Sequence, residues 1–339
     1  MIKRLFASLL FLLLIYLAYH FKSLSYGLKQ AKGQAEVLWN AVPVQELMEK
    51  SSIADSVKEK FRFISSVREY AQTTLGLSES KNYTTYYDQK GEPILWVVTA
   101  SPEFKIKAYQ WSFPLAGNFA YKGFFNYDLA KEEAEKLKQQ GFDTEIDEVS
   151  AWSTLGWFKD PILSSMLNKS EGRLSELIIH ELTHATIFLK NENKLNENLA
   201  TFIGREGAKR FLKDRFGKDS KVLASYLASL DRKKWFKSLS SQAKMSLDSL
   251  YSSFPENATL EEKRHLKHIL LEEYKQNLLR SKYYSQKAGQ ESKLQGFNPN
   301  NAFFSGISTY HESQDSLSSV LESNYNGNLK AFIESLKQL

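Results

Sequence analysis

The chain has no cysteine among its 339 residues. This absence excludes cysteine-ligated zinc, iron–sulfur clusters, disulfide-stapled scaffolds and thiol nucleophiles. Proline and glycine are also scarce, at 7 and 16 residues, which excludes collagen-like and low-complexity chains. Aromatic residues reach 13%, so the chain is not disordered, and it is long enough to bury one or two hydrophobic cores.

Neither sign of charge dominates the sequence. Lys and Arg number 45 against 39 Asp and Glu, which gives a net charge of +6. This mild excess, without a clustered basic face, gives no reason to expect a nucleic-acid partner. Half of the excess lies in residues 1–22, which hold three basic residues and no acidic one.

Residues 1–22 also contain the longest apolar run. Lys3 and Arg4 precede a stretch from Leu5 to Tyr19 that only Ser8 interrupts. The run is short for a membrane-spanning helix, which needs roughly 17–25 residues, and long for a signal peptide. We favour an uncleaved membrane anchor, and a cleaved signal segment is the alternative. In either case the basic residues keep the N-terminus in the cytoplasm, which places the rest of the chain outside it.

The remainder has the pattern of an α+β, predominantly helical protein. Apolar residues at helical spacing predict helices from residue 27 to about 76, and almost throughout after residue 170. Between them the pattern predicts three strands (93–100, 104–113 and 142–149) and a charged helix (128–140). The C-terminal half is expected to form a helical hairpin (219–290), broken near Pro255, and a final helix (313–339).

The residues best suited to chemistry lie in the segment RLSELIIHELTHATIFLK, residues 173–190. His180 and His184 are four residues apart, so a helix presents both imidazoles on one face, one turn apart. This spacing suits two ligands of one tetrahedral zinc ion. Glu181 is turned away from that face but can reach a water molecule held by the metal, so HELTH combines two metal ligands with a general base. The apolar residues around it predict that this helix is buried.

A catalytic zinc ion needs a third protein ligand. Glu197, thirteen residues after His184, lies near the start of the amphipathic segment LNENLATFIG, and a turn at residues 191–194 can bring that segment back against the first helix. Glu192 is the competing ligand, although it lies within the turn. His265, His268 and His311 remain further candidates. Ile187 and Lys190 occupy positions at which the metzincin pattern requires a glycine and another ligand, so that pattern is excluded.

Several segments, together with HELTH, carry a resemblance that extends over nearly the whole chain after residue 22. They are YGLKQAKGQAEVLW (26–39), PLAGNFAYKGFF (114–125), GFDTEIDEVSAWSTLGWFKDPIL (141–163), NENLATFIG (196–204) and NNAFFSGISTYH (300–311). With them the chain resembles the gluzincin group of zinc peptidases, and more closely the bacterial family of predicted aminopeptidases. The resemblance implies a zincin-like metallopeptidase, with a small β-sheet before the HExxH helix and a helical C-terminal half. Many relatives carry an N-terminal lipoprotein cysteine, which this chain lacks.

The resemblance also suggests further site residues. In zincin folds a strand edge before the metal helix lines the substrate cleft, and the candidates here are Ser153, Thr154, Leu155 and Gly156. Tyr310 or His311 could stabilise the oxyanion of the tetrahedral intermediate. Asn300 and Asn301 are expected to cap the following helix.

These expectations combine into one hypothesis about architecture and function. Residues 1–22 anchor the chain, and residues 23–339 form one peptidase domain, with a sheet part at about 90–150 and metal helices at 173–215. His180, His184 and Glu197 bind one Zn²⁺, and Glu181 is the general base of an aminopeptidase that cleaves peptides on the periplasmic side of the inner membrane. The alternatives are a zinc endopeptidase of the cell envelope and a non-catalytic, membrane-anchored scaffold with a structural metal.

Overall fold

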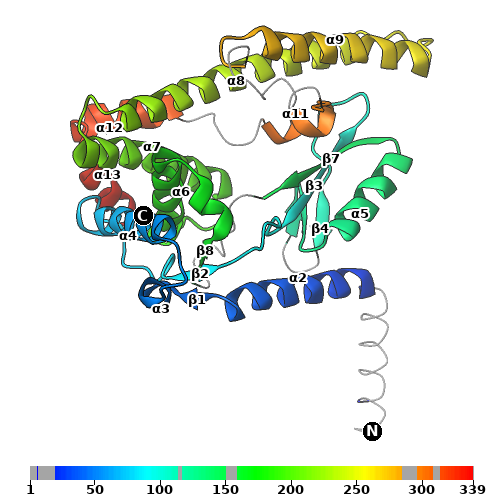
Figure 1. Cartoon of the computed structure of the whole chain (residues 1–339). Helices are drawn as coiled ribbons and strands as arrows, with labels where there is room; N and C mark the ends of the chain where they lie inside the picture. Colours follow the sequence, from blue (N-terminus) through cyan, green and yellow to red (C-terminus); the bar gives the residue numbers. More distant parts are fainter. Residues whose placement is uncertain are drawn as a thin grey trace.

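The computed structural model describes residue 6 and residues 20–113, 117–149, 159–284, 296–307 and 314–338. Its elements, in chain order, are α2 (Phe21–Trp39), β1 (Val42–Pro43), α3 (Val44–Glu49), α4 (Asp55–Thr73), β2 (Thr85–Tyr87), β3 (Trp96–Pro102), β4 (Trp111–Phe113), β5 (Gly117–Phe119), β6 (Lys122–Phe124), α5 (Tyr127–Gln139), β7 (Phe142–Glu148), β8 (Ile162–Leu163), the 3₁₀ helix η1 (Ser164–Asn168), α6 (Glu171–His184), α7 (Asn193–Phe216), α8 (Lys221–Ser252), α9 (Leu260–Arg280), α11 (Asn301–Ile307), α12 (Gln314–Tyr325) and α13 (Leu329–Leu336). The described chain is therefore mostly helical with small sheets, as an α+β protein should be (Figure 1).

The largest hydrophobic core lies among α4, α6, α7 and the two C-terminal helices, α12 and α13. On α4, Phe61, Ile64 and Val67 recur at helical spacing and are at most 1% exposed, so one face of the helix is wholly buried. On α6, Ile178 and Ile179 are fully buried in the same core. The core therefore fixes α6, the helix with the HELTH motif, from several sides.

A three-stranded antiparallel sheet forms a second, smaller core. Its strand order is β6-β3-β7, and β3 pairs with β7 along its whole length, from Trp96 opposite Glu148 to Pro102 opposite Phe142. Helix α5 covers one face of this sheet with the stripe Ala130, Ala134 and Leu137. The N-terminus of α5 is capped by Asn126, and the chain leaves its C-terminus through Gly141 at a φ of 83°.

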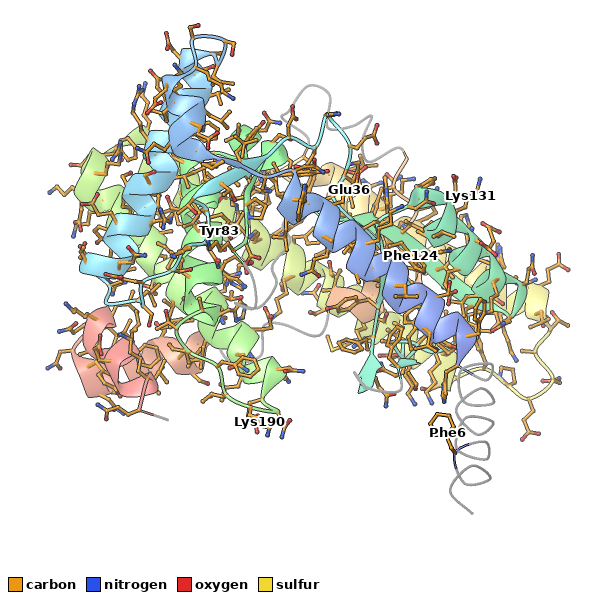
Figure 2. The ribbon with its side chains drawn as sticks, turned by 90° about the horizontal axis from the view of Figure 1, so that it is seen from below. Phe6, Glu36, Tyr83, Phe124, Lys131 and Lys190 are labelled. Carbon is orange, nitrogen blue, oxygen red and sulfur yellow. The ribbon has the colours of Figure 1, made fainter. Side chains whose placement is uncertain are left out.

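Helix α2 lies beside this sheet, next to β6 and Phe124 (Figure 2). The Tyr26 hydroxyl and the Gln30 side-chain amide both donate to the Gly123 carbonyl, each at 2.8 Å. A Cβ atom at Gly33 would overlap the ring of Phe125, so only glycine permits this close approach. The contact attaches the N-terminal helix to the edge of the sheet.

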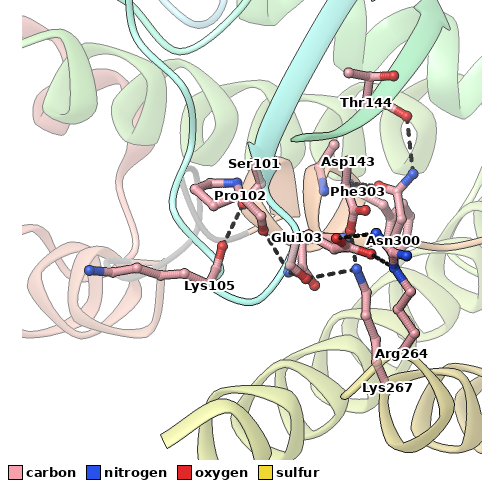
Figure 3. A network of polar contacts seen from close by, with 12 residues as sticks. Ser101, Pro102, Glu103, Lys105, Asp143, Thr144, Arg264, Lys267, Asn300 and Phe303 are labelled. Atoms are coloured by element: carbon pink, nitrogen blue, oxygen red, sulfur yellow. Dashed lines mark hydrogen bonds and ion pairs between the residues drawn. The ribbon is translucent and has the colours of Figure 1, made fainter. Parts of the chain in front are cut away.

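The long hairpin of α8 and α9 is joined to the other end of the sheet by a polar network (Figure 3). The Lys267 ammonium donates to the Asp143 carboxylate at 2.6 Å and to the Glu103 carbonyl at 2.8 Å. The Arg264 guanidinium donates to the Glu103 carboxylate at 2.6 and 3.1 Å, and the Asn301 backbone amide donates to Asp143 at 2.8 Å. This network fastens α9 and α11 to the ends of β3 and β7.

Most of the predicted elements are present in the structure. The helices before residue 76, the charged helix (α5), the first and third strands (β3 and β7) and the hairpin broken near Pro255 (α8 and α9) are all present. Their ends agree with the prediction to within three residues, except that α2 begins six residues earlier, at Phe21, and α9 ends ten residues earlier, at Arg280. The Asn300 side chain accepts from the amides of Ala302 and Phe303, which confirms that it caps α11.

The strand predicted over residues 104–113 is wrong except at its end, because only Trp111–Phe113 is a strand. β6 pairs with β3 only from Trp96 to Val98, and the segment after β3 meets the rest of this edge through a hydrogen bond from the Tyr109 amide to the Ala100 carbonyl (2.8 Å) without forming a strand there. Instead it closes a loop, in which the Ser101 hydroxyl donates to the Lys105 carbonyl and accepts from the Lys107 amide.

The single C-terminal helix predicted for residues 313–339 is also wrong. Asn326 and Gly327 take the left-handed conformation, at φ values of 50° and 71°, and separate α12 from α13. The Asn328 side chain then caps α13 by accepting from the Ala331 amide at 3.1 Å. The break lets both short helices fold onto the main core, where Leu321 and Phe332 are buried.

A second three-stranded sheet was not predicted at all. It joins β1, β2 and β8, of which β2 and β8 are parallel. Each strand has only two or three residues, too few to show a period of two. This sheet helps to position α6, since Leu163 in β8 is followed directly by η1 and then by α6.

The segment predicted to be a membrane anchor, residues 1–22, lies largely outside the described residues. Among the helices that are described, none combines the length and the apolar character needed to cross a bilayer.

The network around Lys267 predicts a large loss of stability for Asp143→Ala. The Lys267 side chain is only 8% exposed, so the variant leaves its charge buried without a carboxylate, and we expect a loss of about 3 kcal/mol in chemical denaturation. Glu135→Ala is the matched control, because its ion pair with Lys138 is half exposed and should contribute less than about 0.5 kcal/mol. Equal effects of the two substitutions would show that the network does not hold the hairpin to the sheet.

Candidate metal centre

The candidate site lies between α6 and α7, which run side by side (Figure 1). The chain leaves α6 at His184, reverses direction and enters α7 at Asn193. Asn196, only 5% exposed, stabilises this reversal, because its side chain accepts from the Leu189 amide at 2.9 Å and donates to the Leu189 carbonyl at 2.8 Å. The reciprocal bonds fix the first turn of α7, including Glu197, against the end of α6.

Glycine allows the two helices to approach very closely. A Cβ atom at Gly204 would lie 2.9 Å from the Glu176 carbonyl oxygen and 3.1 Å from Cβ of His180. At Gly207, one turn further along α7, a Cβ atom would lie 2.8 Å from the Leu75 side chain and 3.1 Å from that of Ile179. The backbone of α7 therefore lies directly against the helix that carries the two histidines.

Three potential metal ligands meet at this helix pair. The Nε2 atoms of His180 and His184 are 3.2 Å apart, and they lie 3.6 and 3.4 Å from the two carboxylate oxygens of Glu197. Ligands at 2.0–2.1 Å from a tetrahedral zinc ion are separated by about 3.3 Å. The observed spacings are close to this value, so the His–His–Glu group could hold a metal ion, and its nitrogen and oxygen donors are those that zinc accepts.

The electrostatics of the group favour ligation by imidazole. Burial, and then the neighbouring His184, lower the pKa of His180 to about 4, which leaves its ring neutral at physiological pH. Burial also acts to lower the pKa of His184, but the hydrogen bond and charge of Glu197 outweigh it and raise that pKa. A metal ion must displace the proton on His184, so metal affinity should fall as the pH drops through the pKa of this residue.

Glu181 lies beside this group and is 9% exposed. The neighbouring Tyr83 is 4% exposed, and burial followed by the charges of Glu181 and Asp160 raises the pKa of its hydroxyl. Tyr83 has a left-handed φ of 61°, and its backbone amide donates to the Asp160 carbonyl at 2.7 Å. The loop around Tyr83 therefore forms part of the buried wall behind Glu181.

The structure brings four of the sequence-predicted residues together, and the others fall into two groups. His180, Glu181, His184 and Glu197 lie at one place. Glu192, His265 and His268 are exposed and do not belong to the metal-ligand group found among the described residues. The predicted residues outside the described part of the chain are Ser153, Thr154, Leu155, Gly156, Tyr310 and His311.

The predicted burial of the metal helix is correct only in part. Ile178 and Ile179 are fully buried, but α6 ends at His184, earlier than predicted, and Phe188 in the following loop is 61% exposed. The reversal needed to bring Glu197 back leaves Phe188 on the outside.

Sequence reasoning missed Tyr121, which follows β5. Partial burial, followed by the charge of Glu197, raises the pKa of its hydroxyl, so Tyr121 lies within electrostatic range of the metal group. Its side chain is 45% exposed and accessible to a ligand. The only signal in the sequence was its place within the segment PLAGNFAYKGFF, which carries part of the family resemblance.

The fold and the site together define a mostly helical α+β protein with a potential metal centre between two helices. The chain belongs to the family described as "Putative aminopeptidase", whose model matches residues 25–339. This finding confirms the predicted family. No curated protein and no solved structure matches the chain significantly.

The geometry of the His–His–Glu group predicts which substitutions abolish metal binding. We expect the purified protein to bind one divalent ion per chain, and His180→Ala or Glu197→Ala to lose most of it, because each removes one of three ligands. Metal content after dialysis, measured by mass spectrometry, checks this. Glu192→Ala is the matched control and should retain the ion; loss of metal in Glu192→Ala instead of Glu197→Ala would assign the third ligand to the turn.

The close approach at Gly204 gives a second prediction. Gly204→Ala forces α7 away from the Glu176 carbonyl, which moves Glu197 relative to the histidines and should weaken metal binding at least tenfold. Isothermal titration calorimetry measures this change. Gly27→Ala is the control, since no atom lies within 4 Å of the added Cβ on α2. Unchanged affinity in Gly204→Ala would mean that the spacing of the helices does not set the geometry of the site.

Proposed function

We propose that the protein is a zinc-dependent aminopeptidase, with Zn²⁺ held by His180, His184 and Glu197. The observation that carries this proposal is that the two histidine Nε2 atoms lie 3.2 Å from each other and 3.6 and 3.4 Å from the two carboxylate oxygens of Glu197, with Glu181 next to His180 on the same helix. Bound zinc supplies a Lewis acid that polarises the scissile carbonyl and acidifies water. The family description supports aminopeptidase activity.

In this proposal Glu181 moves the proton. Its carboxylate accepts a proton from the attacking water molecule and later delivers it to the nitrogen of the leaving amine. The buried Tyr83 hydroxyl lies within electrostatic range of this carboxylate. A purely structural metal site has no use for a carboxylate in this position, which disfavours the non-catalytic scaffold.

Tyr121 is proposed to assist at the substrate carbonyl. Its hydroxyl is accessible and lies within the electrostatic range of Glu197, whereas Tyr83 is too buried to reach a substrate. A hydroxyl that donates to the developing oxyanion stabilises the transition state more than the ground state.

The test compares Glu181→Gln with the wild type on peptides with free and acetylated N-termini. Glu181→Gln should lower kcat at least about 10²-fold, because it removes the proton acceptor, while metal content is unchanged. Glu192→Gln is the control for a change of charge near the site and should behave as the wild type. An aminopeptidase cleaves only the free N-terminus.

Three results would contradict the proposal. Equal cleavage of acetylated peptides would identify an endopeptidase. Full activity of Glu181→Gln would exclude Glu181 as the general base, and no hydrolysis by the zinc-loaded wild type would favour the scaffold.

A further inference from the structure

A cavity of about 480 Å³ opens directly beside His180 and Glu181, between α6, α7 and α8. Its volume is within the range of pockets that hold small ligands. Four basic side chains line it, Lys169, Arg173, Arg205 and Lys233, against the carboxylates of Glu176 and Glu181. We call this cavity the cationic pocket.

The cationic pocket and the metal group share the same two helices. On α6, Glu176 precedes His180 by four residues, and on α7, Arg205 follows Glu197 by eight. A rise of 1.5 Å per residue places Arg205 about 12 Å along α7 from Glu197. The Nε atom of Arg205 lies 3.4 Å from the Glu176 carboxylate, so the side chains of Glu176 and His180 on α6 face those of Arg205 and Glu197 on α7. A substrate at the metal group can therefore extend into the pocket.

Glu176 is already saturated with donors. Its carboxylate accepts from Arg173 at 2.7 Å, from the Tyr226 hydroxyl at 3.3 Å and from Arg205 Nε at 3.4 Å. Burial raises its pKa, but Lys233, Arg173 and Arg205 outweigh that effect and hold the pKa below its usual range. Glu176 is thus fully engaged with the protein and does not offer its charge to a substrate amine.

The positive charge of the pocket exceeds what Glu176 can balance. In the described part of the chain the Lys169 ammonium and both Nη groups of Arg205 make no hydrogen bond or ion pair, and the Lys233 ammonium donates at 3.5 Å to the Glu176 carboxylate, which Arg173 and Arg205 already share. Burial, and then the repulsion of Arg173, lower the pKa of Lys169. Burial is also the main cause that lowers the pKa of Lys233 to about 8, and Arg173 and Arg205 add to it against the attraction of Glu176. The pocket is therefore short of negative charge.

We propose that the cationic pocket binds a carboxylate of the peptide substrate and directs the enzyme to peptides that carry one close to the cleaved bond. This inference rests on the proposed function. Each residue of an extended peptide spans about 3.5 Å, so a span of about 12 Å reaches at most three or four residues along the substrate. The carboxylate is either the C-terminus of a short peptide or an acidic side chain. Both carry the same planar group, which Arg205 can bind through its two Nη groups.

The experiment measures peptide binding to zinc-loaded Glu181→Gln by calorimetry, with two matched pairs of tetrapeptides. Tetra-alanine is compared with its C-terminal amide, and Ala-Ala-Glu-Ala amide with Ala-Ala-Gln-Ala amide. We expect the carboxylate to tighten binding about tenfold in at least one pair. A preference in the first pair identifies the C-terminus as the ligand, and one in the second pair identifies the side chain. Equal affinities within both pairs overturn the proposal.

Variants of the pocket supply the second measurement. Lys169→Gln combined with Lys233→Gln should remove the preference for the carboxylate and change the affinity for the neutral peptide less than twofold. Lys234→Gln is the matched control, because Lys234 lies next to Lys233 on α8 but does not line this pocket. Equal weakening of both peptides by the double variant contradicts a specific carboxylate site.

The same peptides separate this inference from the proposed function. If wild-type protein prefers the carboxylate but hydrolyses no peptide, the pocket is supported and the peptidase proposal fails. If the wild type hydrolyses both members of each pair with the same kcat/KM and binds them equally, the peptidase proposal is supported and the pocket proposal fails.

Discussion

The close packing of α6 against α7 is the constraint on which the site depends. Gly204 lets the α7 backbone lie against Glu176 and His180, and this approach brings Glu197 within 3.6 Å of both histidines. Asn196 fixes the reversal between the helices from its buried position. The remaining elements support this pair: the main core buries the opposite face of α6, and η1 leads into its first turn.

The same helix pair also relates the potential metal centre to the cationic pocket. At one end of the pair, His184 on α6 faces Glu197 on α7, and both are potential metal ligands. Further along, Glu176 on α6 faces Arg205 on α7, and these charged side chains line the cationic pocket. The long helix α8 adds Lys233 and Tyr226 to the charged end. The network around Lys267 holds the far end of the α8–α9 hairpin to the sheet, and so constrains where α8 can lie.

The site could be predicted from the sequence where it depends on local geometry. The four-residue spacing of His180 and His184 fixes their common face, and a short turn suffices to return Glu197. The cationic pocket could not be predicted, since Lys233 lies far along the chain and reaches the site only when α8 docks. The strand over 104–113 was wrong because the first part of this segment closes a loop on the Ser101 hydroxyl, which a sequence period of two does not reveal. The break at Asn326-Gly327 could have been predicted, because this dipeptide is a turn signal. The prediction of a single helix followed the helical spacing of the apolar residues instead.

The most direct measurement of the central claim is anomalous diffraction at the zinc absorption edge from crystals of the zinc-loaded protein. A single strong peak about 2 Å from Nε2 of His180, Nε2 of His184 and a carboxylate oxygen of Glu197 is the expected result. A peak at Glu192, His265 or His268, with none between α6 and α7, would contradict a metal centre at this helix pair.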